Sequence, residues 1–100
     1  MKIKISPFAE MDIMESVSYY DERKPRLGND FLEEVNSTFT YITRNSKIFP
    51  FETRHFQKAI IKRFPFTVIF LVEEQISYII AVFHNRRNPE ELVERYDFFP

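Results

Sequence analysis

The 100-residue sequence contains no cysteine, no tryptophan and a single glycine. Without cysteine, the chain has no disulfide framework and no thiolate chemistry. One glycine, against the ~7% usual in soluble domains, predicts few tight turns and long regular elements. The only two histidines, His55 and His84, are far apart in the sequence, so we expect no metal site and no cofactor.

Long apolar runs and an excess of positive charge are missing as well. No stretch approaches the ~20 apolar residues of a membrane span, and residues 1–5 lack the apolar segment of a signal peptide. We therefore expect a cytoplasmic protein without a membrane partner. The net charge is −1, whereas nucleic-acid-binding domains usually carry a basic excess. Direct sequence-specific DNA binding by this chain alone is not expected.

What the chain does contain is aromatic: twelve phenylalanines and five tyrosines. Each buried aromatic ring removes roughly 150–250 Å² from water, so these residues can supply most of a core. The length suits one compact domain spanning residues 1–100. Phe31, Phe39, Phe64, Phe66 and Phe70 are expected to be core residues.

The first half of the chain predicts a strand and two helices. Residues 2–6 alternate polar and apolar side chains, the period of a short half-buried strand. Ser6 and Pro7 suit an N-cap and a first helical position, and that helix extends to about Arg23. Residues 24–28 interrupt the pattern, and a second helix then runs to about Asn45. Two helices so closely joined predict an antiparallel hairpin.

The second half changes to β-branched and aromatic residues, which favour strands. The expected strands are residues 55–64, 66–72 and 76–84, and a short C-terminal helix follows from Asn88-Pro89 to about Tyr96. The last two strands are apolar on both faces, as in central strands with both faces covered. The fold class is therefore α+β, in the order β-α-α-β-β-β-α, with the N-terminal helical hairpin packed on a small, mainly antiparallel sheet.

Several local motifs in this order resemble the ParE/RelE superfamily of bacterial toxins. They are YYD at 19–21, LGNDFLEEV at 27–35, KRFPF at 62–66 and IAVFHNRRNP at 80–89. The final motif is similar to the ParE-like branch. Two positions depart from the usual pattern: Asn45-Ser46 replaces Asn-Pro, and Phe66 replaces a tyrosine.

The resemblance implies a toxin of a type II toxin–antitoxin system, of the kind linked to plasmid stabilisation. Such a toxin forms a hetero-oligomer with a cognate antitoxin that neutralises it. For ParE-like members the implied target is DNA gyrase. For RelE-like members it is mRNA on the ribosome, cut by attack of a 2′-OH on the adjacent phosphate.

Two observations favour a ParE-like toxin that binds a protein and has no catalytic turnover. Thr67 stands where RelE-like sequences carry an arginine, which removes a cation that would stabilise the reacting phosphate. A chain of net charge −1 is also poorly equipped to dock on ribosomal phosphates. Two alternatives stay open: a ribosome-dependent endoribonuclease, and a non-toxic relic that binds antitoxin. The candidate acid–base set for the endoribonuclease is His84, Arg86, Arg87, Lys62 and Tyr96.

The candidate target-binding residues are mostly cations near strand ends, with two C-terminal aromatics. They are His84, Arg86, Arg87, Arg63, Lys62, Phe98 and Phe99. Simpler structural roles compete with these assignments. His84 suits a hydrogen-bonded structural residue, and one of the two arginines suits an ion pair with Glu90 or Glu91. Even spacing places Arg54, Lys58 and Lys62 on one face of a strand, where lysines also protect an edge.

Overall fold

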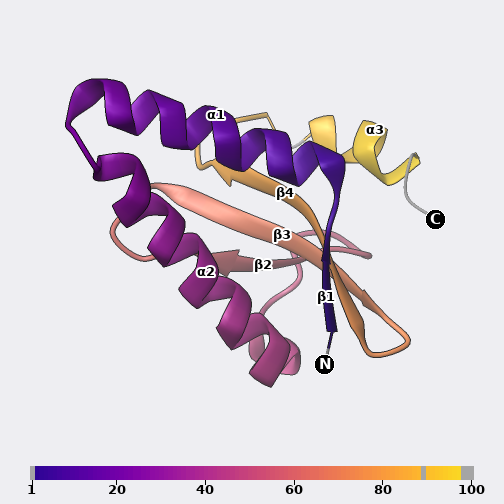
Figure 1. Ribbon diagram of the computed structural model, residues 1–100. Helices are drawn as coiled ribbons and strands as arrows, with labels where there is room; N and C mark the ends of the chain where they lie inside the picture. The colour runs from indigo at the N-terminus through magenta and orange to yellow at the C-terminus, as the bar shows by residue number, and fades with distance from the viewer. Residues whose placement is uncertain (1, 89, 98–100) are drawn as a thin grey trace.

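The computed structural model describes residues 2–88 and 90–97 and has the predicted order of elements (Figure 1). These are β1 (Lys2–Ile5), α1 (Pro7–Arg23), α2 (Leu27–Asn45), a 3₁₀ turn η1 (Ser46–Ile48), β2 (Gln57–Ile60), β3 (Phe66–Glu73), β4 (Ile76–His84) and α3 (Glu91–Asp97). Among these helices, none is long and apolar enough to cross a membrane. The predicted α+β class is confirmed.

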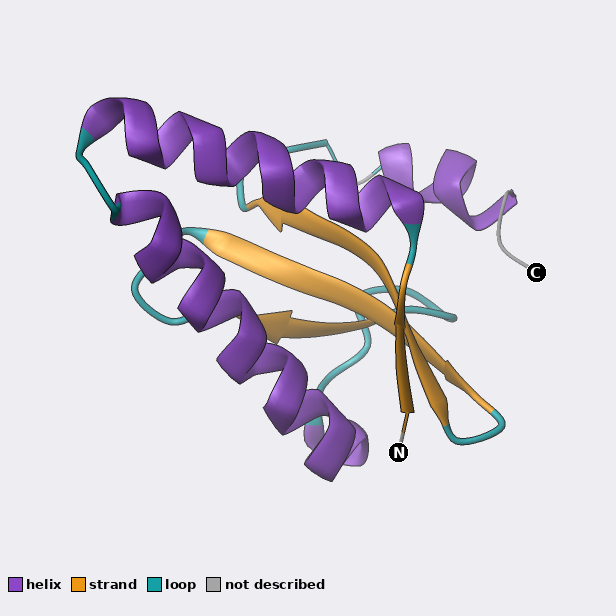
Figure 2. Cartoon of the chain, viewed as in Figure 1, coloured by secondary structure: helices purple, strands orange, loops and turns teal. Residues whose placement is uncertain are grey.

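The four strands form one sheet in the order β1-β4-β3-β2. β1 pairs with β4 in parallel, and the other two pairings are antiparallel, so the expectation of a mainly antiparallel sheet is confirmed. The hairpin of α1 and α2 lies across one face of the sheet (Figure 2). α3 packs against the other face through Leu92. β3 and β4 are thus central strands covered on both sides, which is why their sequences are apolar at nearly every position.

The main core lies between the helical hairpin and the sheet. Phe31 and Phe70 are fully buried there, Phe39 and Phe66 are buried, and Phe64 packs against them at the edge of this core. The core assignment of these five rings is confirmed. A second, smaller core under α3 contains Phe56, Ile69, Ile80, Phe83 and Leu92.

β2 is much shorter than the predicted strand 55–64. Before it, the Thr53 hydroxyl accepts hydrogen bonds from the backbone N–H groups of His55 and Phe56, which folds that segment into a turn. After it, Arg63 adopts a left-handed backbone (φ 70°) that ends the extended conformation. Arg54 and Lys62 therefore lie outside the strand, and the prediction that they share one strand face with Lys58 is wrong.

The second helix begins at Leu27, earlier than its glycine suggested, because α1 supplies its cap. The Asp21 carboxylate accepts a 2.7 Å hydrogen bond from the backbone N–H of Gly28 in the first turn of α2. The contact requires the two helices to approach closely: a Cβ on Gly28 would lie 2.5 Å from Asp21 Oδ1 and 2.6 Å from the Val17 carbonyl oxygen. The single glycine of the sequence therefore lies where the backbones of α1 and α2 are in close contact.

The last helix begins at Glu91, later than predicted. Asn88 still acts as its cap, since its side-chain oxygen accepts a 3.0 Å hydrogen bond from the N–H of Glu90. The expected loop after Asn45 contains the short turn η1.

Replacing Gly28 with alanine should destabilise the protein, although the same change in an open helix stabilises by about 1 kcal/mol. The added Cβ forces α1 and α2 apart, so we expect a loss of about 1–3 kcal/mol, as for other overpacked sites. Urea unfolding followed by circular dichroism measures it. The exposed neighbour Asn29→Ala is the control, and a Gly28→Ala protein as stable as that control would contradict the close contact.

Candidate functional site

A β-bulge in β4 determines the arrangement of the site. Ile69 pairs with Ala81 and Phe70 pairs with Ile79, so Ile80 has no partner on β3. β1 reaches only as far as Ile79. Beyond Ile79, the peptide groups of β4 that do not pair with β3 need other hydrogen-bonding partners, since unpaired buried peptide groups are costly.

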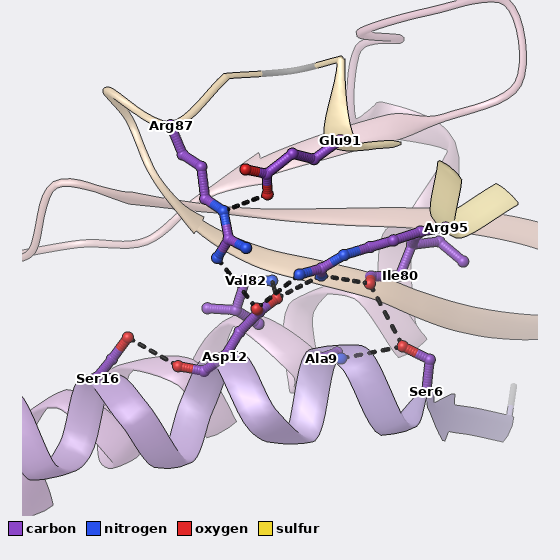
Figure 3. A network of polar contacts seen from close by, with 9 residues as sticks. All are labelled: Ser6, Ala9, Asp12, Ser16, Ile80, Val82, Arg87, Glu91 and Arg95. Carbon is purple, nitrogen blue, oxygen red and sulfur yellow. Dashed lines mark hydrogen bonds and ion pairs between the residues drawn. The ribbon is translucent and has the colours of Figure 1, made fainter. Parts of the chain in front are cut away.

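Side chains from α1, the strand–helix junction and α3 supply those partners (Figure 3). The Asp12 carboxylate, 4% exposed, accepts a 2.9 Å hydrogen bond from the N–H of Val82. The Ile80 carbonyl accepts hydrogen bonds from Ser6 Oγ at 3.3 Å and from Arg95 at 3.1 Å. Among the described residues, no buried side-chain nitrogen or oxygen lacks a partner.

Arg95 connects α3 to α1 through Asp12. The two form a bidentate pair with N–O distances of 2.6 and 2.8 Å, and Arg95 is only 7% exposed. The guanidinium also lies 4.5 Å from the centre of the Phe83 ring. Arg95 thus fixes the last helix on the sheet.

Arg87, in the loop after β4, joins the same network. Its guanidinium bonds to Asp12 at 3.2 Å and to Glu91 at 2.6 Å. The prediction that one arginine of this loop pairs with an acid of the terminal helix is confirmed for Arg87 and Glu91. The second of these bonds lies at the surface, where a pair contributes only ~0–1 kcal/mol.

A cleft of about 500 Å³ opens beside this network, between α1 and the ends of β3 and β4. α1 contributes Tyr19, Tyr20 and Arg23, and the strands contribute Phe66 and His84. The Arg23 guanidinium lies 3.5 Å from the centre of the Tyr19 ring. The cleft is therefore walled by aromatic rings and carries cations at its rim.

Tyr20 forms the floor of the cleft and joins it to the core. Its ring lies 5.4 Å from Phe31, 5.0 Å from Phe64 and 6.1 Å from Phe66, centre to centre. Burial raises the pKa of the Tyr20 hydroxyl above 10.0, with a further rise from Tyr19 and an opposing effect of Arg23. At neutral pH this hydroxyl is protonated and can donate a hydrogen bond to a ligand in the cleft.

His84 and Arg86 lie together at the end of β4. His84 Nδ1 accepts a 3.1 Å hydrogen bond from the backbone N–H of Arg86, so the neutral ring carries its proton on Nε2. The His84 ring also packs edge-on against Phe66 at 5.2 Å. The Arg86 side chain is exposed and makes no ion pair with another described residue. It is thus available to a partner, unlike Arg87.

The other predicted residues are not in the cleft. Arg63 is 61% exposed and lies 4.0 Å from the carboxylates of Asp30 and Glu34 on α2. Lys62 lies near the Tyr41 ring of α2, at 5.9 Å from its centre. Phe98 and Phe99 lie outside the described residues.

Tyr96 is also remote from His84. The Tyr96 ring stacks on the His55 ring, 5.2 Å away centre to centre, and contacts the Phe56 ring. The next residue, Gln57, pairs with Phe70 on β3, and Phe70 pairs with Ile79 on β4. Ile79 is five residues along β4 from His84, which is roughly 16 Å at ~3.3 Å per residue. The acid–base set that the nuclease alternative requires is therefore dispersed.

Sequence reasoning missed Asp12 and Arg95. The signal was present: Asp12 follows Ala9 by three residues and precedes Ser16 by four, so it belongs to the helix face that is buried. Its charge conceals that signal, because acidic residues are rarely buried unless they are paired. Arg95 likewise follows Leu92 by three residues and shares its face. The described residues contain no group of three or more histidines and acids placed to hold a metal ion.

Comparison with solved structures identifies the fold. A chain described as "Chromosomal ParDE TA system from P. aeruginosa" matches with a TM-score of 0.76 and 16% sequence identity, covering 84% of this chain and 95% of that one. No family model and no curated protein matches the sequence. The fold expected from the ParE/RelE resemblance is confirmed.

Replacing Asp12 with asparagine should lower the free energy of unfolding by about 3–5 kcal/mol, the usual cost of removing one partner from a buried ion pair. The change leaves Arg95 buried without a countercharge. Urea denaturation measures the loss, and Glu15→Gln on the exposed side of the same helix is the control. In the double variant Asp12→Asn/Arg95→Leu, the loss should be smaller than the sum of the two single losses. Additive losses would show that the two side chains act independently.

Ionisation of Tyr20 should also be visible at high pH. Because the pKa of Tyr20 is raised in the folded state, the stabilisation linked to its protonated hydroxyl is fully present below pH 10.0 and is lost as the pH rises further. The difference in absorbance at 295 nm between the wild type and Tyr20→Phe should therefore titrate with a midpoint above 10.0. A midpoint at or below that value would contradict the burial of the hydroxyl.

Proposed function

We propose that the chain is the toxin of a type II toxin–antitoxin system, of the ParE kind, and that a cognate antitoxin neutralises it. The observation that carries this proposal is the structural match to a chain of a ParDE TA system over nearly the whole of that chain. The motifs that resemble the superfamily agree with it. Tyr20, Phe31, Phe64 and Phe66, all from those motifs, form the aromatic cluster under the cleft.

The toxin acts by binding a protein, and it has no catalytic turnover of its own. Two features support this part of the proposal. Arg87 is occupied by Asp12 and Glu91, and Tyr96 lies far from His84 along the sheet. Phosphate cleavage requires a base, an acid and cations around one reacting group, and two members of the candidate set, Lys62 and Tyr96, lie outside the cleft that His84 and Arg87 line.

Thr67 gives further support. It occupies the place where RelE-like sequences carry an arginine, and its hydroxyl donates a 2.7 Å hydrogen bond to the side-chain oxygen of Asn85. This contact stabilises the loop after β4 and offers no charge to a phosphate. An aromatic cleft rimmed by a few cations suits a protein surface, where aromatic and arginine side chains are enriched in binding sites.

The target proposed by resemblance is DNA gyrase, bound through the cleft and the His84–Arg86 loop. Expression of the chain without antitoxin should stop DNA synthesis before protein synthesis and induce the SOS response. Separate pulse labels for DNA and protein measure the order of the two effects. The double variant His84→Ala/Arg86→Ala should relieve the arrest, since loss of central contacts typically weakens binding about tenfold or more.

Arg54→Ala is the matched control for that variant, because Arg54 is exposed and remote from the cleft, and its growth arrest should equal that of the wild type. Early translational arrest with cleaved mRNA would refute the gyrase proposal in favour of the endoribonuclease. A chain that never inhibits growth would be a relic that only binds antitoxin.

A further inference from the structure

The cleft between α1 and the ends of β3 and β4 contains hydrogen-bond donors that the described part of the chain does not use. The Tyr20 hydroxyl forms no hydrogen bond with another described residue, and neither does the Nε2–H of the neutral His84 ring. Both side chains line the cleft. The Phe66 ring contacts both, at 6.1 Å from the Tyr20 ring and 5.2 Å from the His84 ring. Two polar groups without described partners are thus joined by one apolar surface.

Arg23 adds a cation that is already held in place. Its guanidinium lies 3.5 Å from the centre of the Tyr19 ring and donates a 3.4 Å hydrogen bond to the Tyr19 carbonyl. The other N–H groups of the guanidinium have no partner among the described residues, and Arg23 forms no ion pair with any of them. A stacked guanidinium is already ordered, so less conformational entropy is lost when a ligand binds to it.

The Arg23 charge lies close to the Tyr20 hydroxyl. Burial raises the pKa of that hydroxyl, Tyr19 raises it further, and the positive charge of Arg23 lowers it. A charge that shifts the pKa of a group in this way is near that group. Tyr20 and Arg23 are also three residues apart on α1, the spacing of neighbours on a helix surface. The hydroxyl and the guanidinium can therefore donate to the same ligand.

The size and walls of the cleft suit a flat ring beside these donors. Its volume of about 500 Å³ falls within the range of small-molecule sites, roughly 300–1,000 Å³. Tyr19, Tyr20 and Phe66 line it, and aromatic rings bind other rings by offset stacking or edge contacts. An aromatic ligand would therefore find apolar contacts on more than one side.

The charges of the lining suit one negative charge on that ligand. Asp12 is neutralised by Arg95 and Arg87, so Arg23 is the lining arginine that has no acidic partner among the described residues. Glu15, exposed at the rim, would repel a second negative charge. A carboxylate carries a single charge and matches the planar guanidinium, whereas a doubly charged phosphate fits this balance less well.

We propose that the cleft binds a small aromatic carboxylate, whose ring packs against Phe66 and Tyr19 and whose carboxylate accepts hydrogen bonds from Tyr20 and Arg23. The ligand fills the cleft to which the protein target was assigned above, so the two compete for it. In this respect alone the inference rests on the proposed function. Binding of the ligand itself requires only the folded chain.

The test is a titration of the purified, ¹⁵N-labelled full chain with indole-3-acetate, followed by two-dimensional NMR. The backbone signals of Tyr20, Phe66 and His84 should shift and saturate, with a dissociation constant of about 1 mM or below for a ligand of this size. Indole-3-acetamide keeps the ring and loses the charge, and hexanoate keeps the charge and loses the ring. Each should bind about threefold to tenfold more weakly than indole-3-acetate.

Substitutions in the cleft should separate the two parts of the ligand. Arg23→Gln should weaken binding of indole-3-acetate about threefold to tenfold and leave binding of indole-3-acetamide unchanged, which a merely structural role would not produce. Tyr20→Phe keeps the ring and should also weaken binding of the acid. Glu15→Gln removes a repulsive charge and should strengthen it. Arg44→Gln is the matched control, since Arg44 is exposed on α2 and does not line the cleft.

Thermal unfolding checks that each variant is folded, and the exposed Arg23 keeps the test valid where Tyr20→Phe is destabilised. Equal binding of acid and amide, equal binding by Arg23→Gln and the wild type, or cleft signals that do not shift would each overturn the inference. A chain that arrests growth but binds no aromatic acid keeps the proposed function and loses the ligand site. A chain that binds the acid in the cleft but never arrests growth keeps the ligand site and loses the proposed function.

Discussion

A buried carboxylate must be surrounded by donors, and in this chain that requirement joins the two ends of the sequence. Asp12 receives hydrogen bonds from the β4 backbone, from Arg95 and from Arg87. The network is needed because β1 ends opposite Ile79 and Ile80 has no partner on β3, which leaves peptide groups of β4 without a neighbouring strand. Burying such a pair costs desolvation on both sides, so its net contribution to stability is small. Its effect is to give α1, β4 and α3 one relative position.

The candidate sites follow from that geometry. Once Asp12 and Glu91 hold Arg87, Arg86 is the described cation of the loop that forms no ion pair with another described residue, and the cleft is left with an aromatic floor and a protonated Tyr20.

The motifs that resemble the ParE/RelE superfamily mostly describe the core. Gly28 is the point of contact between two helices, and Tyr20, Phe31, Phe64 and Phe66 pack on one another. Packing constraints of this kind persist while the surface changes. A match of TM-score 0.76 at 16% identity is consistent with such a pattern. The same motifs are correspondingly less informative about the surface of the protein.

The order and type of the elements followed from the sequence alone, because periodicity, the Ser6-Pro7 helix start and the doubly apolar strands are local signals. The pairing of an exposed arginine with Glu91 was also within reach, since the two lie four residues apart. The positions of Asp12 and Arg95 were decided only by the tertiary structure, because a charge is buried where distant groups neutralise it. The same applies to the short β2, whose ends depend on the Thr53 turn and on the backbone of Arg63, and to the separation of Tyr96 from His84. Local sequence determines which elements form, whereas the partners of polar groups depend on how those elements pack.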